Sequence, residues 1–156
     1  MDTTASNPHV VIIGCGFGGL EATKALHKTN VRITLIDRSN QRLFQPLRYQ
    51  VATAGLSAPA IATPIRHLFC KQANVTTLLG DVVAIDAQAQ TATPHSPGTA
   101  DAQIGFDHLI VAAGATHSYF GNDRWEPFAP GLKTLADAMA LRKAGVCFAA
   151  QVVVIS

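Results

Sequence analysis

Three glycines between an apolar run and a helical pattern constrain the fold of this chain more than any other feature. They lie in the stretch HVVIIGCGFGGLEATKAL at residues 9–26. The β-branched run before them predicts a buried parallel strand over residues 10–13, and the pattern after them predicts a helix over residues 17–28. The run VRITLI predicts a second strand over residues 31–36. Strand, glycine turn, helix and strand in this order predict a βαβ unit.

The glycines have the spacing G-x-G-x-x-G, formed by Gly14, Gly16 and Gly19. In this context the first permits a tight turn, the second lets backbone N–H groups approach a pyrophosphate, and the third lets helix and strand pack closely. The positive end of the helix then faces the phosphates. Gly18 adds another residue without a side chain. The pattern predicts a dinucleotide site, and the alternative is an ordinary glycine-containing loop.

A carboxylate follows where such a site needs one. Asp37 stands 18 residues after Gly19, at the end of the second predicted strand, where it would accept hydrogen bonds from ribose hydroxyls. An acid there argues against a 2′-phosphate on the ligand, although the neighbouring Arg38 keeps that alternative open. NAD and FAD both use this pattern, so the glycines alone do not choose between them.

The chain then leaves the βαβ unit and returns to it. We expect an ordered connection over residues 38–58 and strands over residues 75–79 and 82–85. Residues 87–103 are polar and predict a hairpin or surface excursion. A buried strand is expected over residues 108–112, followed by the small residues Ala113 and Gly114, which let backbone pass close to a ligand.

Two helix starts are indicated by capping residues. Thr63 and Pro64 predict an N-cap and a first helical residue. Thr134 is expected to open a later helix, with Asp137 in the position of a capping box.

Composition excludes several functions. Of the 156 residues 48% are hydrophobic and 14% charged, and the net charge of +2 with no basic run argues against nucleic-acid binding. No segment has the length of a membrane span or the pattern of a signal peptide, which favours a cytoplasmic protein. Cysteines 15, 70 and 147 and the six histidines have no ligand spacing, so no metal site and no disulfide framework are expected.

The order of the elements is typical of flavoproteins with two dinucleotide units, because the first unit is interrupted by β structure and closed by a strand with a small-residue turn. Flavin disulfide reductases carry a CxxxxC pair after the second strand, whereas residues 38–60 contain no cysteine. A flavin bound here would therefore pass its electrons directly to a diffusing acceptor. A plain NAD-binding module is the alternative.

Longer stretches carry a specific resemblance within residues 10–142. They are VVIIGCGFGGLEATKAL, ITLIDRSN, LFQPLRYQVATAGLS, IATPIRHLF, FDHLIVAAGATHSYFG and WEPFAPGLKTLADAMALR. With them the chain resembles the N-terminal part of the type II NADH dehydrogenases, single-chain NADH:quinone oxidoreductases of respiratory electron transport that do not pump protons. The resemblance implies an α/β, Rossmann-like FAD-binding domain within an incomplete two-dinucleotide flavoprotein fold.

The resemblance also implies which residues hold the FAD. The glycine turn would cradle the pyrophosphate, Asp37 with Arg38 beside it would meet the ribose, the backbone of Val82 would meet the adenine, and a segment around Gln50 would lie along the isoalloxazine ring. The full set of implied cofactor residues is Gly14, Gly16, Phe17, Gly18, Gly19, Asp37, Arg38, Gln50, Ala52, Thr53, Val82, Ala113 and Gly114. No catalytic acid or base is assigned, since the redox chemistry belongs to the cofactor.

In this family, NADH reduces the flavin and the flavin reduces a membrane quinone at the cytoplasmic face. This chain departs from the family pattern at Arg42, where histidine is common, at Arg48, where an apolar residue is expected, and at Ala113, where threonine is usual. A related flavoprotein such as a sulfide:quinone oxidoreductase is an alternative, but it normally needs redox cysteines around the flavin.

The last stretch, KAGVCFAAQVVVIS, does not continue the family's long helix. We expect residues 1–142 to form a partial FAD-binding domain that binds FAD weakly and is inactive alone. Residues 143–156 have two interpretations, the first strand of a missing NADH-binding domain or an aberrant, frameshifted tail. A non-catalytic remnant is the corresponding alternative for the whole chain, and a complementing chain is not identified by the sequence.

Overall fold

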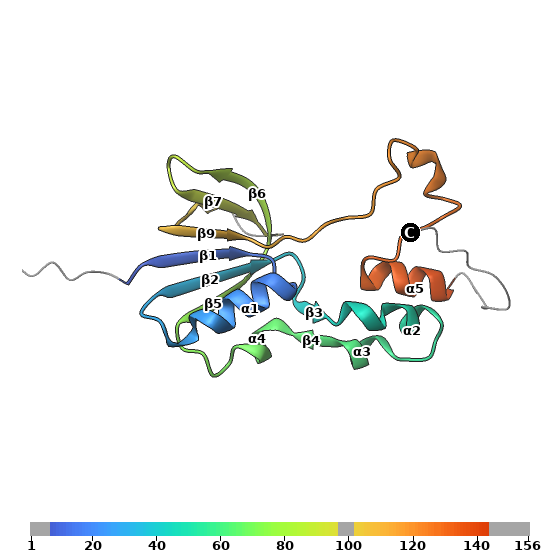
Figure 1. Ribbon diagram of the computed structural model, residues 1–156, viewed down its shortest axis with the longest axis horizontal. Coiled ribbons are helices and arrows are strands. Elements are labelled where there is room, and N and C mark those ends of the chain that lie inside the picture. The colour runs from blue at the N-terminus through green and yellow to red at the C-terminus, as the bar shows by residue number, and fades with distance from the viewer. Residues whose placement is uncertain (1–6, 97–101, 144–156) are drawn as a thin grey trace, which may run out of the picture. The chain divides into compact units, whose positions relative to one another are not determined.

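The computed structural model describes residues 7–96 and 102–143, and the chain divides into two compact units. The first unit comprises the chain up to Arg42 together with Pro64–Gly114. The second comprises Leu43–Thr63 and the chain from Ala115 onward. Figure 1 shows the chain and labels most of its helices and strands.

The first unit is built on a four-stranded parallel sheet with the order β5-β2-β1-β9. Its strands are β1 (His9–Ile13), β2 (Arg32–Asp37), β5 (Val75–Leu79) and β9 (His108–Val111). Helix α1 (Phe17–Ala25) connects β1 to β2 and continues as a 3₁₀ turn, η1, to Lys28. The βαβ unit predicted from the sequence is therefore confirmed.

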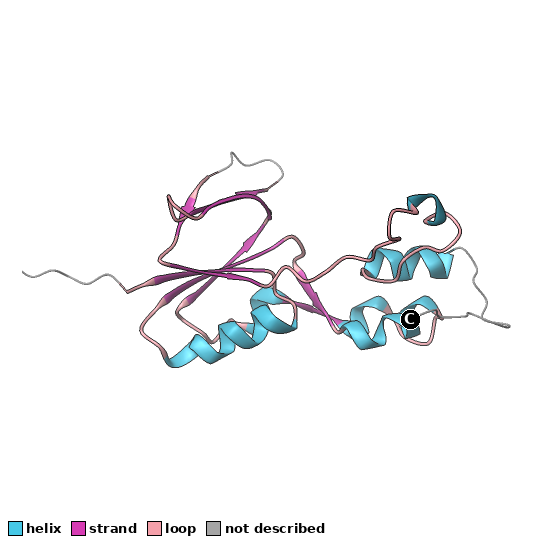
Figure 2. Cartoon of the chain, turned by 45° about the horizontal axis from the view of Figure 1, so that its top comes forward, coloured by secondary structure: helices cyan, strands magenta, loops and turns pink. Residues whose placement is uncertain are grey.

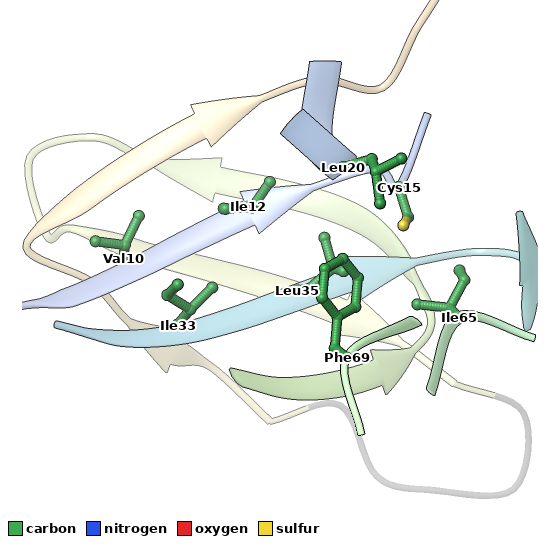
Figure 3. Close-up of a cluster of buried hydrophobic side chains, with 8 residues drawn as sticks. All are labelled: Val10, Ile12, Cys15, Leu20, Ile33, Leu35, Ile65 and Phe69. Carbon is green, nitrogen blue, oxygen red and sulfur yellow. The ribbon is translucent and has the colours of Figure 1, made fainter. Parts of the chain in front are cut away.

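Alternate residues of the central strands face opposite sides of the sheet, and both sides are covered. On one side, Ile12 and Leu35 pack with Leu20 of α1 and with Phe69, as Figure 3 shows for this cluster. On the other side, Val11 and its neighbours pack against a small antiparallel sheet. Figure 2 views the parallel sheet nearly edge-on, with α1 and the antiparallel sheet on opposite faces. Covering on both faces explains the continuous β-branched runs of β1 and β2.

The antiparallel sheet has the order β6-β7-β8, from β6 (Asp81–Asp86), β7 (Thr91–His95) and β8 (Ile104–Gly105). Its first hairpin turns where the Asp86 carboxylate accepts hydrogen bonds from two following backbone N–H groups at 2.9 and 2.8 Å. This is the polar hairpin that the sequence predicts, except for residues 97–101, which lie outside the described part.

The second unit is helical. It contains α2 (Arg48–Ala52), α3 (Ala58–Ile61) and α5 (Leu135–Lys143), with the 3₁₀ turns η2 (Gln45–Leu47) and η3 (Asp123–Trp125). Its buried residues are Val51, Ala52, Ile61 and Ala138. The start of α5 is the expected capping box: the Thr134 hydroxyl accepts a hydrogen bond from the backbone N–H of Asp137 at 3.1 Å, and the Asp137 carboxylate accepts that of Thr134 at 2.7 Å.

Two sequence predictions are wrong. Thr63 does not cap a helix, because it lies in a short strand, β4 (Ala62–Pro64), which pairs with β3 (Gln41–Leu43), and α4 (Ile65–Leu68) begins after it. The strand expected to be buried at residues 108–112 is β9, an edge strand that is only partly buried. The tail interpretations concern residues 143–156, of which only Lys143, the last residue of α5, is described.

Candidate functional site

The turn between β1 and α1 is held in a conformation that only glycine adopts readily. Gly14 has φ +94°, and its N–H donates to the carbonyl of Ile36 at 2.7 Å. A Cβ on Gly14 would lie 2.5 Å from the carbonyl oxygen of Ala112, just after β9. The first glycine therefore lets the carboxyl ends of β1 and β9 meet closely, at the point where the strand order reverses around β1.

The other glycines of the pattern differ in what surrounds them. A Cβ on Gly19 would overlap the carbonyl oxygen of Gly14, so α1 approaches the turn only because this residue has no side chain. A Cβ on Gly18 would make an ordinary contact of 3.7 Å with Ala112. At Gly16 nothing lies within 4 Å of a Cβ, so the fold itself leaves open space beside the middle of the turn.

The N-terminus of α1 lies at this open turn, and no side chain of the described residues caps it or neutralises its partial positive charge. Gly16 is the N-cap and makes no side-chain hydrogen bond, and the first turn of the helix contains no acidic residue. The partial positive charge of the helix end is therefore available to an anion.

Asp37, at the end of β2, fastens the glycine turn. Its Oδ2 accepts a hydrogen bond from the backbone N–H of Cys15 at 2.6 Å, and its Oδ1 accepts that of Ser39 at 2.7 Å. A carboxylate oxygen has capacity for a second donor, so both oxygens can still accept a hydroxyl. Cys15 is buried, and burial first, then the Asp37 carboxylate, raises the pKa of its thiol to about 11, which keeps it protonated and unreactive.

A pocket of about 80 Å³ brings four segments of the chain together at the carboxyl ends of the strands. Five of the sequence-predicted residues line it: Gly14, Asp37, Arg38, Val82 and Ala113. Gly80 and Asp81, which were not among the predicted residues, line the same pocket. The strand register could have identified them: Asp37 pairs with Leu79, so the residues after Leu79 lie at the same edge of the sheet as Asp37. The pocket is smaller than a dinucleotide and would hold only part of one.

The remaining predicted residues lie elsewhere. Phe17 begins α1, and Gly114 follows the pocket with φ +75°. Gln50, Ala52 and Thr53 belong to the second unit, in α2 and at its C-cap. Ala52 is buried in that unit's core, and the Thr53 hydroxyl donates to the carbonyl of Tyr49 at 3.0 Å.

Two arginines at departures from the family pattern are half-buried. Arg48 donates from Nε to the carbonyl of Gln45 at 3.1 Å, and burial lowers its pKa while Asp137 opposes that effect. Arg42 places its guanidinium carbon 5.1 Å from the centroid of the Phe17 ring. Arg42 was not predicted to lie at the site, because Phe17, which it contacts, is 25 positions earlier in the chain.

Among the described residues, no group of three histidines, cysteines or acids is placed to hold a metal ion. Within the same part of the chain, no helix is long and apolar enough to cross a bilayer.

A sequence profile of the pyridine nucleotide-disulphide oxidoreductases matches residues 8–155. The type II NADH:quinone oxidoreductase NdhA of Mycobacterium tuberculosis is 54% identical over 133 residues, which are 85% of this chain and 28% of that protein. The type II NADH:quinone oxidoreductase Ndh of the same organism is 50% identical over 144 residues, which are 90% of this chain and 31% of that protein. The chain thus spans about three-tenths of the length of these curated relatives.

A solved structure of NDH2 from Plasmodium falciparum in complex with NADH superposes with a TM-score of 0.80 at 22% identity. The superposition covers 88% of this chain and 28% of that one. At this level of identity the likeness concerns the fold.

Proposed function

The chain belongs to the pyridine nucleotide-disulphide oxidoreductase family, and from this premise we propose that it binds FAD as the flavin-binding part of an NADH:quinone oxidoreductase. The observation that carries the proposal is the pocket at the carboxyl ends of β1, β2 and β9, where residues from four separate segments converge beside the glycine turn. Relatives at 54% and 50% identity are NADH:quinone oxidoreductases, which supports the choice of reaction.

The described residues fit a dinucleotide. The open space at Gly16 and the uncapped end of α1 suit the pyrophosphate, with Phe17, Gly18 and Gly19 continuing the cradle. The Asp37 carboxylate, which already fastens the turn, has acceptor capacity left for ribose hydroxyls.

The other roles in the proposal follow the family resemblance. Arg38 lies beside the ribose, the backbone of Val82 meets the adenine, and Ala113 with Gly114 closes the site. Gln50, Ala52 and Thr53 would lie along the isoalloxazine ring.

When bound, FAD would supply the redox chemistry, which is acceptance of a hydride from NADH and delivery of two electrons to a quinone. The chain's own residues bind and orient the cofactor. We place this reaction at the cytoplasmic surface of the membrane that carries the quinone, and we assign residues 1–142 to the FAD-binding part.

Gly16→Ala tests the proposal, because an added methyl group at this position would affect ligand binding without affecting the fold. The fold has room for the methyl group, and Gly16 has φ −69°, which alanine adopts without strain. A phosphate held against the turn would collide with it. We expect the dissociation constant for FAD to rise about tenfold or more, as for the loss of one charge-assisted hydrogen bond, with an unchanged melting temperature.

Gly105→Ala is the matched control, since Gly105 also has nothing within 4 Å of a Cβ and lies in β8, outside the pocket. It should alter neither FAD binding nor melting. Equal FAD affinity in wild type and Gly16→Ala would contradict the placement of the pyrophosphate, and a wild-type chain that does not bind FAD would contradict the proposal as a whole.

A further inference from the structure

Arg42 is a half-buried cation that forms no ion pair among the described residues. Its Nε–H group is buried and donates to no hydrogen-bond partner among the described residues. Within that same set, the ion pair that the structure contains joins Lys24 to Glu21, so no carboxylate neutralises Arg42. Withdrawing a guanidinium from water without a counter-charge costs free energy, which an arriving anion would offset.

The position of this charge is defined by residues on both sides of Gly16. The guanidinium carbon lies 5.1 Å from the Phe17 ring centroid, which is the range of a cation–π contact. On the other side, burial and then Asp37 raise the pKa of the Cys15 thiol, and the positive charge of Arg42 opposes that rise. Arg42 therefore lies beside the residues that precede and follow Gly16.

Two sources of positive potential then act on the open space at Gly16. One is the end of α1, which has no side-chain cap and no acidic residue in its first turn. The other is Arg42, whose guanidinium carbon lies 5.1 Å from the centroid of the Phe17 ring, next to Gly16 in the chain. A diphosphate carries negative charge on both phosphoryl groups and would be met by both sources.

We propose that Arg42 pairs with the diphosphate of the bound dinucleotide and makes the site select ligands that carry one. The assignment rests on the proposed FAD binding, which it deepens by naming the group that neutralises the phosphates. Arg38 does not duplicate this role, because it lines the pocket beside Asp37 and Val82. A merely structural Arg42 would cover Phe17 and affect stability without affecting the salt dependence of binding.

The test measures dissociation constants of the full chain for FAD, ADP and adenosine by calorimetry, at ionic strengths of about 0.05 and 0.5 M. The variants are Arg42→Gln, which removes the charge, and Arg42→Lys, which keeps it. Arg32→Gln is the matched control, since Arg32 is exposed at the first residue of β2, at the opposite end of the strand from Asp37. Melting temperatures are recorded for each variant.

We expect Arg42→Gln to weaken FAD and ADP binding about tenfold at low ionic strength, and the loss to shrink at high ionic strength. Adenosine, which has no phosphate, should bind equally to wild type and variant. Arg42→Lys should retain most of the affinity, and Arg32→Gln should behave as wild type.

Wild-type affinity of Arg42→Gln for FAD and ADP would overturn the assignment and leave the proposed function intact. A loss that is equal for adenosine, or that Arg42→Lys shares in full, would also overturn it, because the effect would then be structural. A wild-type chain that binds neither FAD nor ADP would overturn the proposed function and the assignment together.

Discussion

Replacing Gly19 by alanine should disrupt the first unit, because α1 approaches the preceding turn too closely for a side chain. The added Cβ would overlap the carbonyl oxygen of Gly14 and lie 2.9 Å from its carbonyl carbon, whereas ordinary contacts begin near 3.4 Å. Gly14 cannot move away easily, since its N–H is bonded to Ile36 at 2.7 Å and its φ is +94°. The helix must shift instead, which loosens Leu20 from the sheet.

Overpacking of this kind costs about 3 kcal/mol, at the upper end of its usual range because the obstacle is backbone. For a unit of this size the melting temperature should fall by roughly 12–24 °C. The assay is thermal unfolding followed by far-ultraviolet circular dichroism. Gly18→Ala is the control in the same helix, since its Cβ would meet Ala112 at an ordinary 3.7 Å, and it should melt at or slightly above wild type. A Gly19→Ala chain with the melting temperature of wild type would refute the close approach of α1 to the Gly14 carbonyl.

Two further predictions concern stability. Burial, and to a lesser extent the charge of Arg32, lowers the pKa of His9 in the folded chain. As the pH falls, His9 is therefore protonated more readily in the unfolded chain than in the folded one. The free energy of unfolding should be full above about pH 6.5 and fall as the pH drops below it. His9→Gln keeps a polar group that can bond to Thr34 but does not titrate. Urea unfolding at about pH 7.5 and 5.5 should therefore show a smaller loss of stability for this variant than for wild type. An equal loss in both would contradict the role of His9 in the pH dependence. Thr134→Ala removes the hydroxyl that accepts a hydrogen bond from the backbone N–H of Asp137, and it should lower the free energy of unfolding by about 1 kcal/mol in the same assay. Thr116→Ala, at an exposed residue, is the control and should leave stability unchanged. Equal values for the two variants would contradict the capping role of Thr134.

The βαβ unit could be predicted because its determinants are local. The apolar runs of β1 and β2 and the glycine turn between them lie within 29 consecutive residues, from His9 to Asp37. The capping box at Thr134 was predictable for the same reason, since its partner is three positions away. In each case the deciding contact joins residues close in sequence.

Elements decided by distant contacts were not predicted correctly. The run at residues 108–111 is as apolar as β1, yet β9 lies at the edge of the sheet, and strand order is not encoded in a strand's own pattern. Thr63 and Pro64 make a plausible helix start in isolation, but pairing of β4 with β3 holds them extended. Helix α2 has only five residues, too few to show a period.

The candidate site shows the same division. The sequence identified Asp37 from its distance to the glycines, but not its hydrogen bond to Cys15, which depends on where β2 ends beside the turn. Val82 was assigned through the family resemblance, and the structure brings it to the pocket with Asp37. Arg42 carried no local signal, because its relation to Phe17 exists only in the folded unit.

The most direct test of FAD binding is an equilibrium titration of the full chain, purified without flavin, against FAD, with flavin absorbance and fluorescence as readouts. Circular dichroism of the same sample establishes that the chain is folded. We expect a saturable change at one FAD per chain, which ADP competes away. A folded chain that leaves the flavin spectrum unchanged at all FAD concentrations would contradict it.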